Sequence, residues 1–264
     1  MTAVENQKIA SVITFALEAY GFLKYFAFHN SGKHYQTPFT ALTLFSYIYW
    51  IVTLFLQLVF LIGVLSDNSR IHNEGNKIVG TVGYHFTVSN LISFFWFYYF
   101  KKEKFILSEI LLVVNLVNLL SLYIVHKTVS IKSIKEWIFI HLPITSLPLS
   151  WTLYAIFWNG AAMFHSHNKS LLARILANVF IWEFLITPGA FLIFHNDWSV
   201  GLASSFLTFG VGLNQFFTKM IAFQWIFAFV IAGLLFIFSL FTLFGVFKKN
   251  NNQLTSNEQA PLLA

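Results

Sequence analysis

The chain has no cysteine among its 264 residues, and charged residues make up only 10% of it. The absence of cysteine excludes structural disulfides, thiolate catalysis, Cys-ligated zinc and iron–sulfur clusters. A soluble domain carries roughly 25% charged residues, so a chain this poor in charge cannot cover a surface that faces water. The hydrophobic residues, 57% of the total, occur in long runs. The composition therefore predicts an integral membrane protein.

Sequence patterns of catalytic sites are also missing. The chain contains no HExxH, GxSxG, Walker or Gly-rich phosphate motif, and no Ser/His/Asp set follows from spacing. His165 and His167 stand two positions apart, on opposite sides of a helix, and make a poor metal pair. We therefore expect no enzyme activity, no cofactor and no metal site. The net charge of +6 comes from scattered Lys and Arg residues, so we expect no nucleic-acid partner.

Apolar runs of the length that crosses a bilayer recur along the chain. A hydrocarbon core of about 30 Å needs about 20 apolar residues in a helix. Such runs predict spans at about 39–65, 78–100, 105–125, 171–194, 199–217 and 221–247, and one more that follows Pro143 and Pro148 and ends near Phe164. Pro188 and Gly189 are expected to kink or interrupt the fifth span near one end. The sequence thus predicts an all-α polytopic bundle of about seven spans, with a membrane domain at residues 38–247.

Two segments are interpreted as helices that lie on the membrane surface. Residues 1–37 contain an apolar run, 9–28, that is interrupted by Glu18 and Lys24, which favours an amphipathic, interfacial helix. A crossing helix is the alternative and would make eight spans. A second interfacial helix is predicted near 131–138, where isoleucines keep helical spacing, and Pro143 is expected to end it.

The C-terminal tail, residues 248–264, is polar and predicted to be disordered. Glu258, Leu262 and Leu263 match an acidic di-leucine sorting signal, which adaptor proteins would capture as an extended peptide. The alternative is a chance match of a short pattern. The signal predicts a cytosolic C-terminus and a vacuolar, lysosomal or endosomal membrane. Asn168 begins a glycosylation sequon, which falls on the lumenal side in that orientation.

Polar residues at membrane depth are the candidates for function, because ionisable groups there are costly. Glu183 lies near the middle of the fifth predicted span, with Thr187 one turn later on the same face. Such a carboxyl could serve a proton relay, or it could be neutral and hold a neighbouring helix. The predicted pathway residues are Glu183, His85, Asn115, Asn118, Asn159 and His141. Each could instead be a hydrogen bond between helices.

A family resemblance rests on a set of aromatic and amide motifs. These are Gly83-Tyr84-His85-Phe86 with Asn90, Asn115, His141-Leu142-Pro143, Trp151, Phe157-Trp158-Asn159-Gly160-Ala161 and Leu176-Ala177-Asn178-Val179-Phe180. Over about residues 38–245 the pattern resembles a fungal family of multi-pass membrane proteins of unknown function. The resemblance implies a fungal origin and a membrane location, and it implies no activity.

Two functions compete at this point. The polar residues at membrane depth favour a transporter-like protein for a small solute or an ion, coupled to protons, in which Glu183→Gln should abolish flux. The absence of catalytic motifs and the many small and amide residues suited to helix packing favour a scaffold, assembly factor or accessory subunit that binds another membrane protein. A seven-helix sensor fits the span count, but residues 224–247 hold no lysine for a retinal Schiff base.

Overall fold

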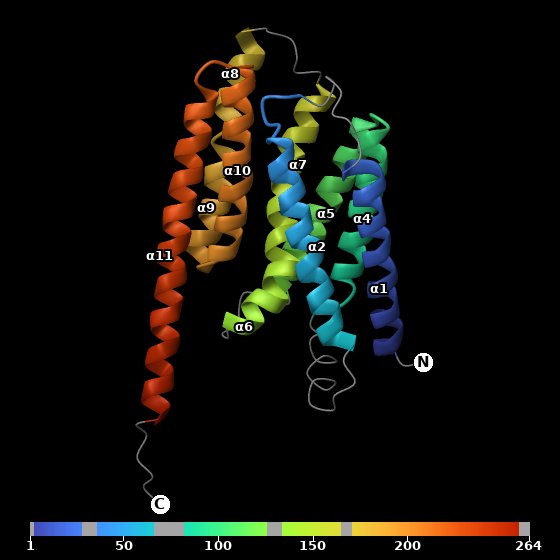
Figure 1. Ribbon diagram of the computed structural model, residues 1–264, viewed down its shortest axis with the longest axis vertical. Helices are drawn as coiled ribbons and strands as arrows, with labels where there is room; N and C mark the ends of the chain where they lie inside the picture. The colour runs from blue at the N-terminus through green and yellow to red at the C-terminus, as the bar shows by residue number, and fades with distance from the viewer. Residues whose placement is uncertain (1–2, 28–35, 66–81, 126–133, 165–170, 259–264) are drawn as a thin grey trace, which may run out of the picture.

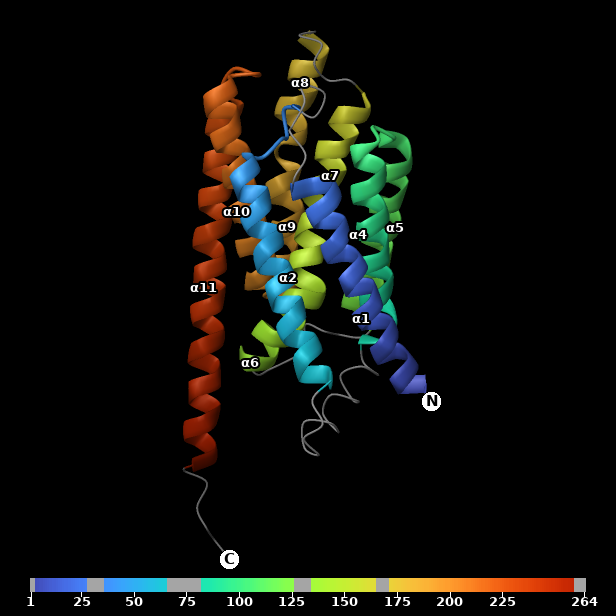
Figure 2. The same ribbon diagram turned by 45° about the vertical axis from the view of Figure 1, so that its right-hand side comes forward.

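The chain folds as a bundle of long helices that run roughly parallel to one another (Figure 1). The computed structural model describes residues 3–27, 36–65, 82–125, 134–164 and 171–258, and these ranges contain helices and no strand. Successive helices alternate in direction, and the start of α1 lies at the same end of the bundle as the end of α11 (Figures 1 and 2). The predicted all-α fold is confirmed.

Eight rods can be followed through the described residues. In chain order they are α1 (Ala3–Gly21) with the π-helix η1 (Phe22–Ala27); α2 (Thr43–Leu65); α4 (His85–Lys101); α5 (Phe105–Val125); α6 (Ile134–Glu136) with the π-helix η4 (Trp137–Ser146) and α7 (Leu147–Met163); α8 (Leu171–Phe180) with α9 (Glu183–His195); α10 (Trp198–Thr218); and α11 (Gln224–Glu258). One group contains α1, α4 and α5, another contains α9, α10 and α11, and α2 and α7 lie between them (Figure 1).

The bundle is apolar on its outside and carries polar groups inside. Phe55, Ile124, Ile193 and Phe241 are each more than 60% exposed, whereas Gln57, Asn90 and Asn159 are fully or almost fully buried. An exposed apolar belt of this size fits a lipid environment and not water. Within the described ranges, seven helical segments are long and apolar enough to cross a membrane: Val4–Ala27, Thr43–Leu65, Phe105–Ile124, Trp137–Met163, Arg174–His195, Trp198–Thr218 and Gln224–Gly245.

The N-terminal segment is one of these seven by length and composition, which fits the alternative of a crossing helix. Helix α1 packs lengthwise against α4 and continues without a break into η1. Glu18 is buried against neighbouring helices, while Lys24 lies near the end of the rod, where its long side chain reaches outward. Helix α4, which was predicted as a span, has 17 described residues and falls just below the length of the other seven. With both rods counted, the chain passes through the bundle eight times.

The prediction that Pro143 ends a helix is wrong. Residues 134–163 form one uninterrupted rod instead of an interfacial helix that ends at Pro143, because the π-helix η4 accommodates that proline. In the fifth predicted span the regular helix is interrupted at Ile181 and Trp182, and α9 continues through Pro188. The interruption therefore lies upstream of Pro188, which itself stands inside the helix.

The C-terminal part of the chain differs from the prediction in one respect. Helix α11 continues to Glu258, so residues 248–258 of the predicted disordered tail are helical, and the helix extends beyond the rest of the bundle (Figure 2). Leu262 and Leu263 of the sorting signal, and Asn168 of the sequon, lie outside the described residues. The signal and the sequon therefore stay predictions.

Candidate functional site

Three predicted pathway residues join α5 to its neighbours. The His85 Nδ1 atom lies 2.8 Å from Asn118 Oδ1, and Asn118 Nδ2 donates to the His85 carbonyl oxygen at 3.0 Å, which connects α4 with α5. Asn115 Nδ2 donates to Thr152 Oγ1 at 3.2 Å, which connects α5 with α7. These bonds satisfy polar groups across helix interfaces, as expected of residues that hold a membrane bundle together.

Asn159 makes the same kind of connection two turns further along the α5–α7 interface. It is fully buried, and its Nδ2 donates to Phe105 O at 2.9 Å and to Glu109 Oε2 at 2.6 Å. Its Oδ1 accepts from Ser108 Oγ at 2.7 Å. The amide therefore has partners at both ends, and it fixes the start of α5 against α7.

Glu183 stands apart from these contacts. The carboxyl is half-buried at the start of α9 and accepts a hydrogen bond from Thr187 Oγ1, one turn later, at 3.2 Å. It borders a cavity of about 20 Å³ that is also lined by Ser150 and Ser204. The structure pairs Glu183, His85, Asn115 and Asn159 with different partners and does not bring them together around one described cavity.

His141 belongs to a buried cluster at the N-terminal end of α10. Its Nε2 lies 2.8 Å from Asp197 Oδ2, and both side chains are fully buried. Tyr123 Oη donates to the same carboxylate oxygen at 2.9 Å. The other oxygen, Oδ1, accepts from Ser199 N and Val200 N, so Asp197 caps the N-terminus of α10.

The charge state of Asp197 follows from these neighbours. Burial would raise the pKa of its carboxyl, but the charge of His141 and the hydrogen bonds from His141, Ser199 and Val200 outweigh burial, and the pKa lies below its ordinary value. Asp197 is therefore ionised at neutral pH. The cluster ties α5, η4 and α10 together.

A second buried acid, Glu18, lies inside the bundle between α1, α2 and α4. The carboxyl is 2% exposed and accepts hydrogen bonds from the side chains of Gln57 and Ser93. With its amide nitrogen turned toward the two acceptors, Asn90 donates to Glu18 Oε2 and to Phe86 O, at 3.2 Å each. Within the described part of the chain, no Lys, Arg or His side chain contacts this carboxyl.

Glu18 was not among the predicted pathway residues. In the sequence, its charge inside the apolar run favoured an interfacial helix over a crossing one. A signal was present in the sequence. Gln7, Ser11, Thr14 and Glu18 follow one another at helical spacing, and all four are buried in the structure. A polar stripe of this kind on an otherwise apolar helix indicates a face that packs inside a membrane bundle.

An aromatic layer covers the Glu18 cluster on one side. Phe22 follows Glu18 by one helical turn, Phe97 follows Ser93 by one turn on α4, and Trp50 precedes Gln57 by two turns on α2. The ring centroids of Trp50 and Phe97 are 4.8 Å apart, and Phe22 lies 6.0 Å from Trp50 and 6.2 Å from Phe97. The layer continues into α7, because Trp151 lies 5.2 Å from Trp50. These rings separate the carboxyl from the end of the bundle beyond them.

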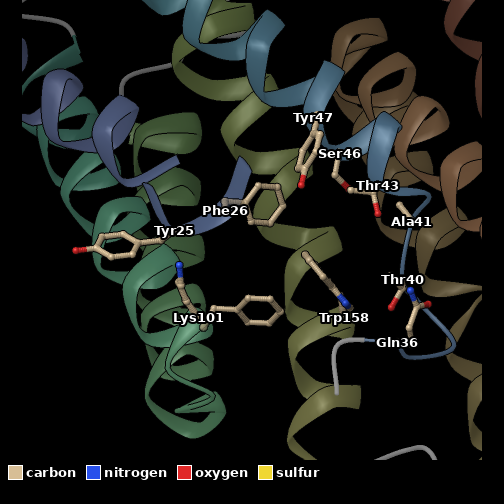
Figure 3. A pocket seen from close by; sticks show the side chains of 11 residues that line it. Tyr25, Phe26, Gln36, Thr40, Ala41, Thr43, Ser46, Tyr47, Lys101 and Trp158 are labelled. Carbon is tan, nitrogen blue, oxygen red and sulfur yellow. The ribbon is translucent and has the colours of Figure 1, made fainter. Parts of the chain in front are cut away.

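A pocket lies on the far side of this layer, where η1, α2, α4 and α7 meet (Figure 3). It has a volume of about 50 Å³. Its floor and walls include Phe26, Tyr47 and Trp158, and Lys101 lies on one side, opposite Gln36 (Figure 3). Along each of α1–η1, α2 and α4 the same order therefore repeats: pocket residues, then an aromatic ring of the layer, then a member of the Glu18 cluster.

A metal ion is not the best occupant of this arrangement. Among the described residues, no group of three or more His, Cys, Asp or Glu side chains is placed to hold a metal. The pocket can bind a solute of a few atoms, and the Glu18 carboxyl can take up or release a proton. Fold and site together define a polytopic α-helical membrane protein with a small pocket above a buried acid.

Comparisons with known proteins show partial similarity over the C-terminal part of the chain. Residues 174–263 match the model of a fungal protein family of unknown function, DUF1774. Over 97 residues the chain is 35% identical to the uncharacterized protein C637.03 of Schizosaccharomyces pombe, and this stretch covers 37% of the chain and 36% of that protein. No solved structure matches the chain. The resemblance to a fungal family of unknown function is confirmed.

The matched stretch is shorter than the resemblance predicted from the motifs. It includes Leu176–Phe180, whereas the motifs from Gly83 to Ala161 lie before residue 174. The match thus covers α8 to α11, and the Glu18 cluster and the pocket lie outside it.

Proposed function

We propose that this membrane protein transports a small solute, that the solute enters at the pocket near Trp158, and that Glu18 carries the coupled proton. The observation that supports this most is the position of Glu18: a buried acid with no cation beside it in the described part of the chain, one aromatic layer away from a pocket. A carboxylate inside a membrane bundle is costly unless its charge is neutralised. A proton can supply that neutralisation and leave again on the other side.

The π-helix η1 supports a moving role for the aromatic layer. It begins at Phe22, directly after the turn that holds Glu18, and it includes the pocket residues Tyr25 and Phe26. Single π-turns occur frequently at functional sites, because their weaker hydrogen-bond pattern is easily rearranged. A shift of η1 toward α-helical geometry would move Phe22 and Phe26 together, which would open or close the path between the pocket and Glu18.

Replacing Glu18 by glutamine should abolish proton-coupled flux, because the amide keeps the size of the side chain but cannot exchange a proton. The measurement is proton uptake into proteoliposomes under an imposed membrane potential, with and without a panel of amino acids, sugars and small organic acids. Wild-type protein should take up protons with at least one solute, and the Glu18→Gln protein with none. Glu183→Gln is the matched control, since Glu183 also lies in a span but is half-buried and away from the pocket.

Wild-type flux no greater than that of empty liposomes, or full flux in the Glu18→Gln protein, would refute the transport proposal. The earlier prediction placed the relay at Glu183, and loss of flux only in Glu183→Gln would restore it.

A scaffold or accessory subunit is the second candidate. It is favoured by the interhelical bonds of His85, Asn115, Asn118 and Asn159, which hold helices together and line no common cavity. This function requires stable co-purification with another membrane protein. Isolation of the protein alone and monodisperse in a mild detergent would count against it.

We also propose that the protein resides in a vacuolar or endosomal membrane, on the basis of the tail signal. Leu262→Ala together with Leu263→Ala should shift a fluorescently tagged protein to the plasma membrane in yeast cells, because adaptor proteins need both apolar side chains. Leu254→Ala, in the helical part of the tail, is the control and should not change the location. An unchanged vacuolar or endosomal pattern in the double variant would remove the signal from the proposal.

A further inference from the structure

The charge of the pocket points to the kind of solute it takes. Among the described residues, Lys101 is its one charged lining residue, and no acidic residue lines it. The other polar lining groups are hydroxyls and an amide, namely Thr40, Thr43, Ser46 and Gln36, with Tyr47 among the rings. Every one of these groups can donate a hydrogen bond. A pocket of donors with one ammonium group suits a solute with negatively charged oxygen atoms.

The aromatic layer beneath the pocket carries further donors that have no acceptor. The indole Nε1 atoms of Trp50 and Trp151, and of Trp96 beside the layer, are buried and make no hydrogen bond within the described part of the chain. The three rings adjoin one another: Trp151 lies 5.2 Å from Trp50 and 5.9 Å from Trp96, centroid to centroid. An indole N–H can only donate, and leaving it buried without a partner costs free energy. Three such groups in and beside the layer indicate that an acceptor is present there during function.

The surface around the pocket has the same sign of charge. Lys24 follows the start of η1, and Lys101, Lys102 and Lys104 gather at the turn between α4 and α5, with Glu103 as the acid among them. Lys101 Nζ also lies 5.9 Å from the centre of the Tyr25 ring, at the edge of the pocket. A positive rim raises the local concentration of anions at the mouth.

We propose that the pocket binds a small organic carboxylate, whose charged oxygens face Lys101 and then the indole donors of the aromatic layer. The pocket volume of about 50 Å³ corresponds to roughly four water-sized groups, which matches an anion of the size of acetate or propionate. The inference rests on the proposed function for the coupling step. One proton on Glu18 would balance the charge of one carboxylate, so the pair would cross without net charge.

Binding of propionate to the purified protein in nanodiscs, measured by calorimetry, tests the site without any transport. Propionamide has the same shape and no charge, and it should bind at least about tenfold more weakly, the effect of one charge-assisted hydrogen bond. Lys101→Gln should weaken propionate binding by about the same factor, and Lys101→Arg should retain it. Lys102→Gln is the matched control, because Lys102 is exposed and does not line the pocket.

The contribution of the indole donors is tested by Trp151→Phe, which keeps an aromatic ring in the layer and removes the N–H. Propionate should bind several-fold more weakly to this variant while its melting temperature changes little. Equal binding of propionate and propionamide, no binding of either, or unchanged propionate binding in Lys101→Gln would overturn the inference. Unchanged binding in Trp151→Phe would overturn the part assigned to the layer.

These outcomes are distinguishable from failure of the transport proposal. Glu18→Gln should bind propionate as wild type does, because the aromatic layer separates Glu18 from the pocket, and it should carry no flux. If propionate does not bind but protons still move with another solute, the solute class is wrong and transport stands. If propionate binds and Glu18→Gln changes no flux, the pocket stands and the proton role of Glu18 is wrong.

Discussion

Replacing Asp197 by alanine is expected to destabilise the bundle by about 3–5 kcal/mol, the usual cost of breaking a buried ion pair. The substitution removes the partner of His141, the acceptor for Tyr123 and the cap of α10 in one step. All of these groups are buried, so water does not replace the lost acceptor. The melting temperature in detergent, followed by tryptophan fluorescence, should fall markedly.

Asp197→Asn is the graded control for this prediction. Its amide oxygen can still accept from Ser199 N and Val200 N, so the cap of α10 persists. The charge opposite His141 and the acceptor for Tyr123 are lost. The loss of stability should therefore be clearly smaller than for alanine. Equal melting temperatures for wild type and Asp197→Ala would show that the cluster does not hold α5, η4 and α10 together.

The same carboxyl determines how the protein responds to acid. Its pKa is lower in the folded protein than the ordinary value of 3.8, so the folded state binds fewer protons than the unfolded state over that range. The stabilisation is complete above the ordinary value and is lost as the pH falls through the lower, folded value. As the pH falls below the ordinary value of 3.8, the melting temperature of wild type should therefore fall more steeply than that of Asp197→Asn.

Gly201→Ala should disrupt the packing of α10 against α9 and α11. A methyl group at this position would overlap Ser239 Oγ and would lie 2.7 Å from Leu192 Cδ1. Both neighbours are buried, so the helices have to move apart. Overpacking of this kind costs typically about 1–3 kcal/mol, and here the clash involves two helices at once. The expected result is a lower melting temperature and a poor yield of folded protein.

Gly233→Ala on α11 is the matched control, because nothing lies within 4 Å of the added methyl group. In a regular helix, alanine is favoured over glycine by up to about 1 kcal/mol, so this variant should be as stable as wild type or slightly more so. If Gly201→Ala behaves in the same way, the close approach of α10 to α11 is not tight in solution.

The spans could be predicted because crossing a bilayer is a local property of the chain. About 20 consecutive apolar residues suffice, whatever their neighbours are, and six of the seven predicted spans recur as membrane-length helices. The sequence was less informative where the packing of neighbouring helices determines the structure. Pro143 was expected to end a helix, but η4 absorbs it. In the sequence, Glu18 and Lys24 favoured an interfacial helix. In the structure that helix packs against α4, and Glu18 is buried there.

The candidate functional residues show the same difference between what one helix reveals and what depends on contacts between helices. His85, Asn115, Asn118, Asn159 and Glu183 could be selected as polar residues at membrane depth, since that follows from position in an apolar run. Whether two such residues share a cavity or bond to each other depends on how helices rotate and pair, which no spacing within one helix reveals. The Asp197–His141 pair joins residues 56 positions apart, and the layer of Trp50, Phe97 and Trp151 joins three helices.

By itself, the sequence determined that this chain is a cysteine-free, all-α membrane protein, because hydropathy and composition act residue by residue. Only the tertiary structure decided that the N-terminal helix packs lengthwise against α4 and that Glu18 is its buried acid. It also decided that the pocket near Lys101 opens above that acid. The physical reason is that burial, hydrogen bonding and cavity shape are properties of several helices together. The free energy that selects their arrangement depends on contacts between helices, which are not a property of any single helix.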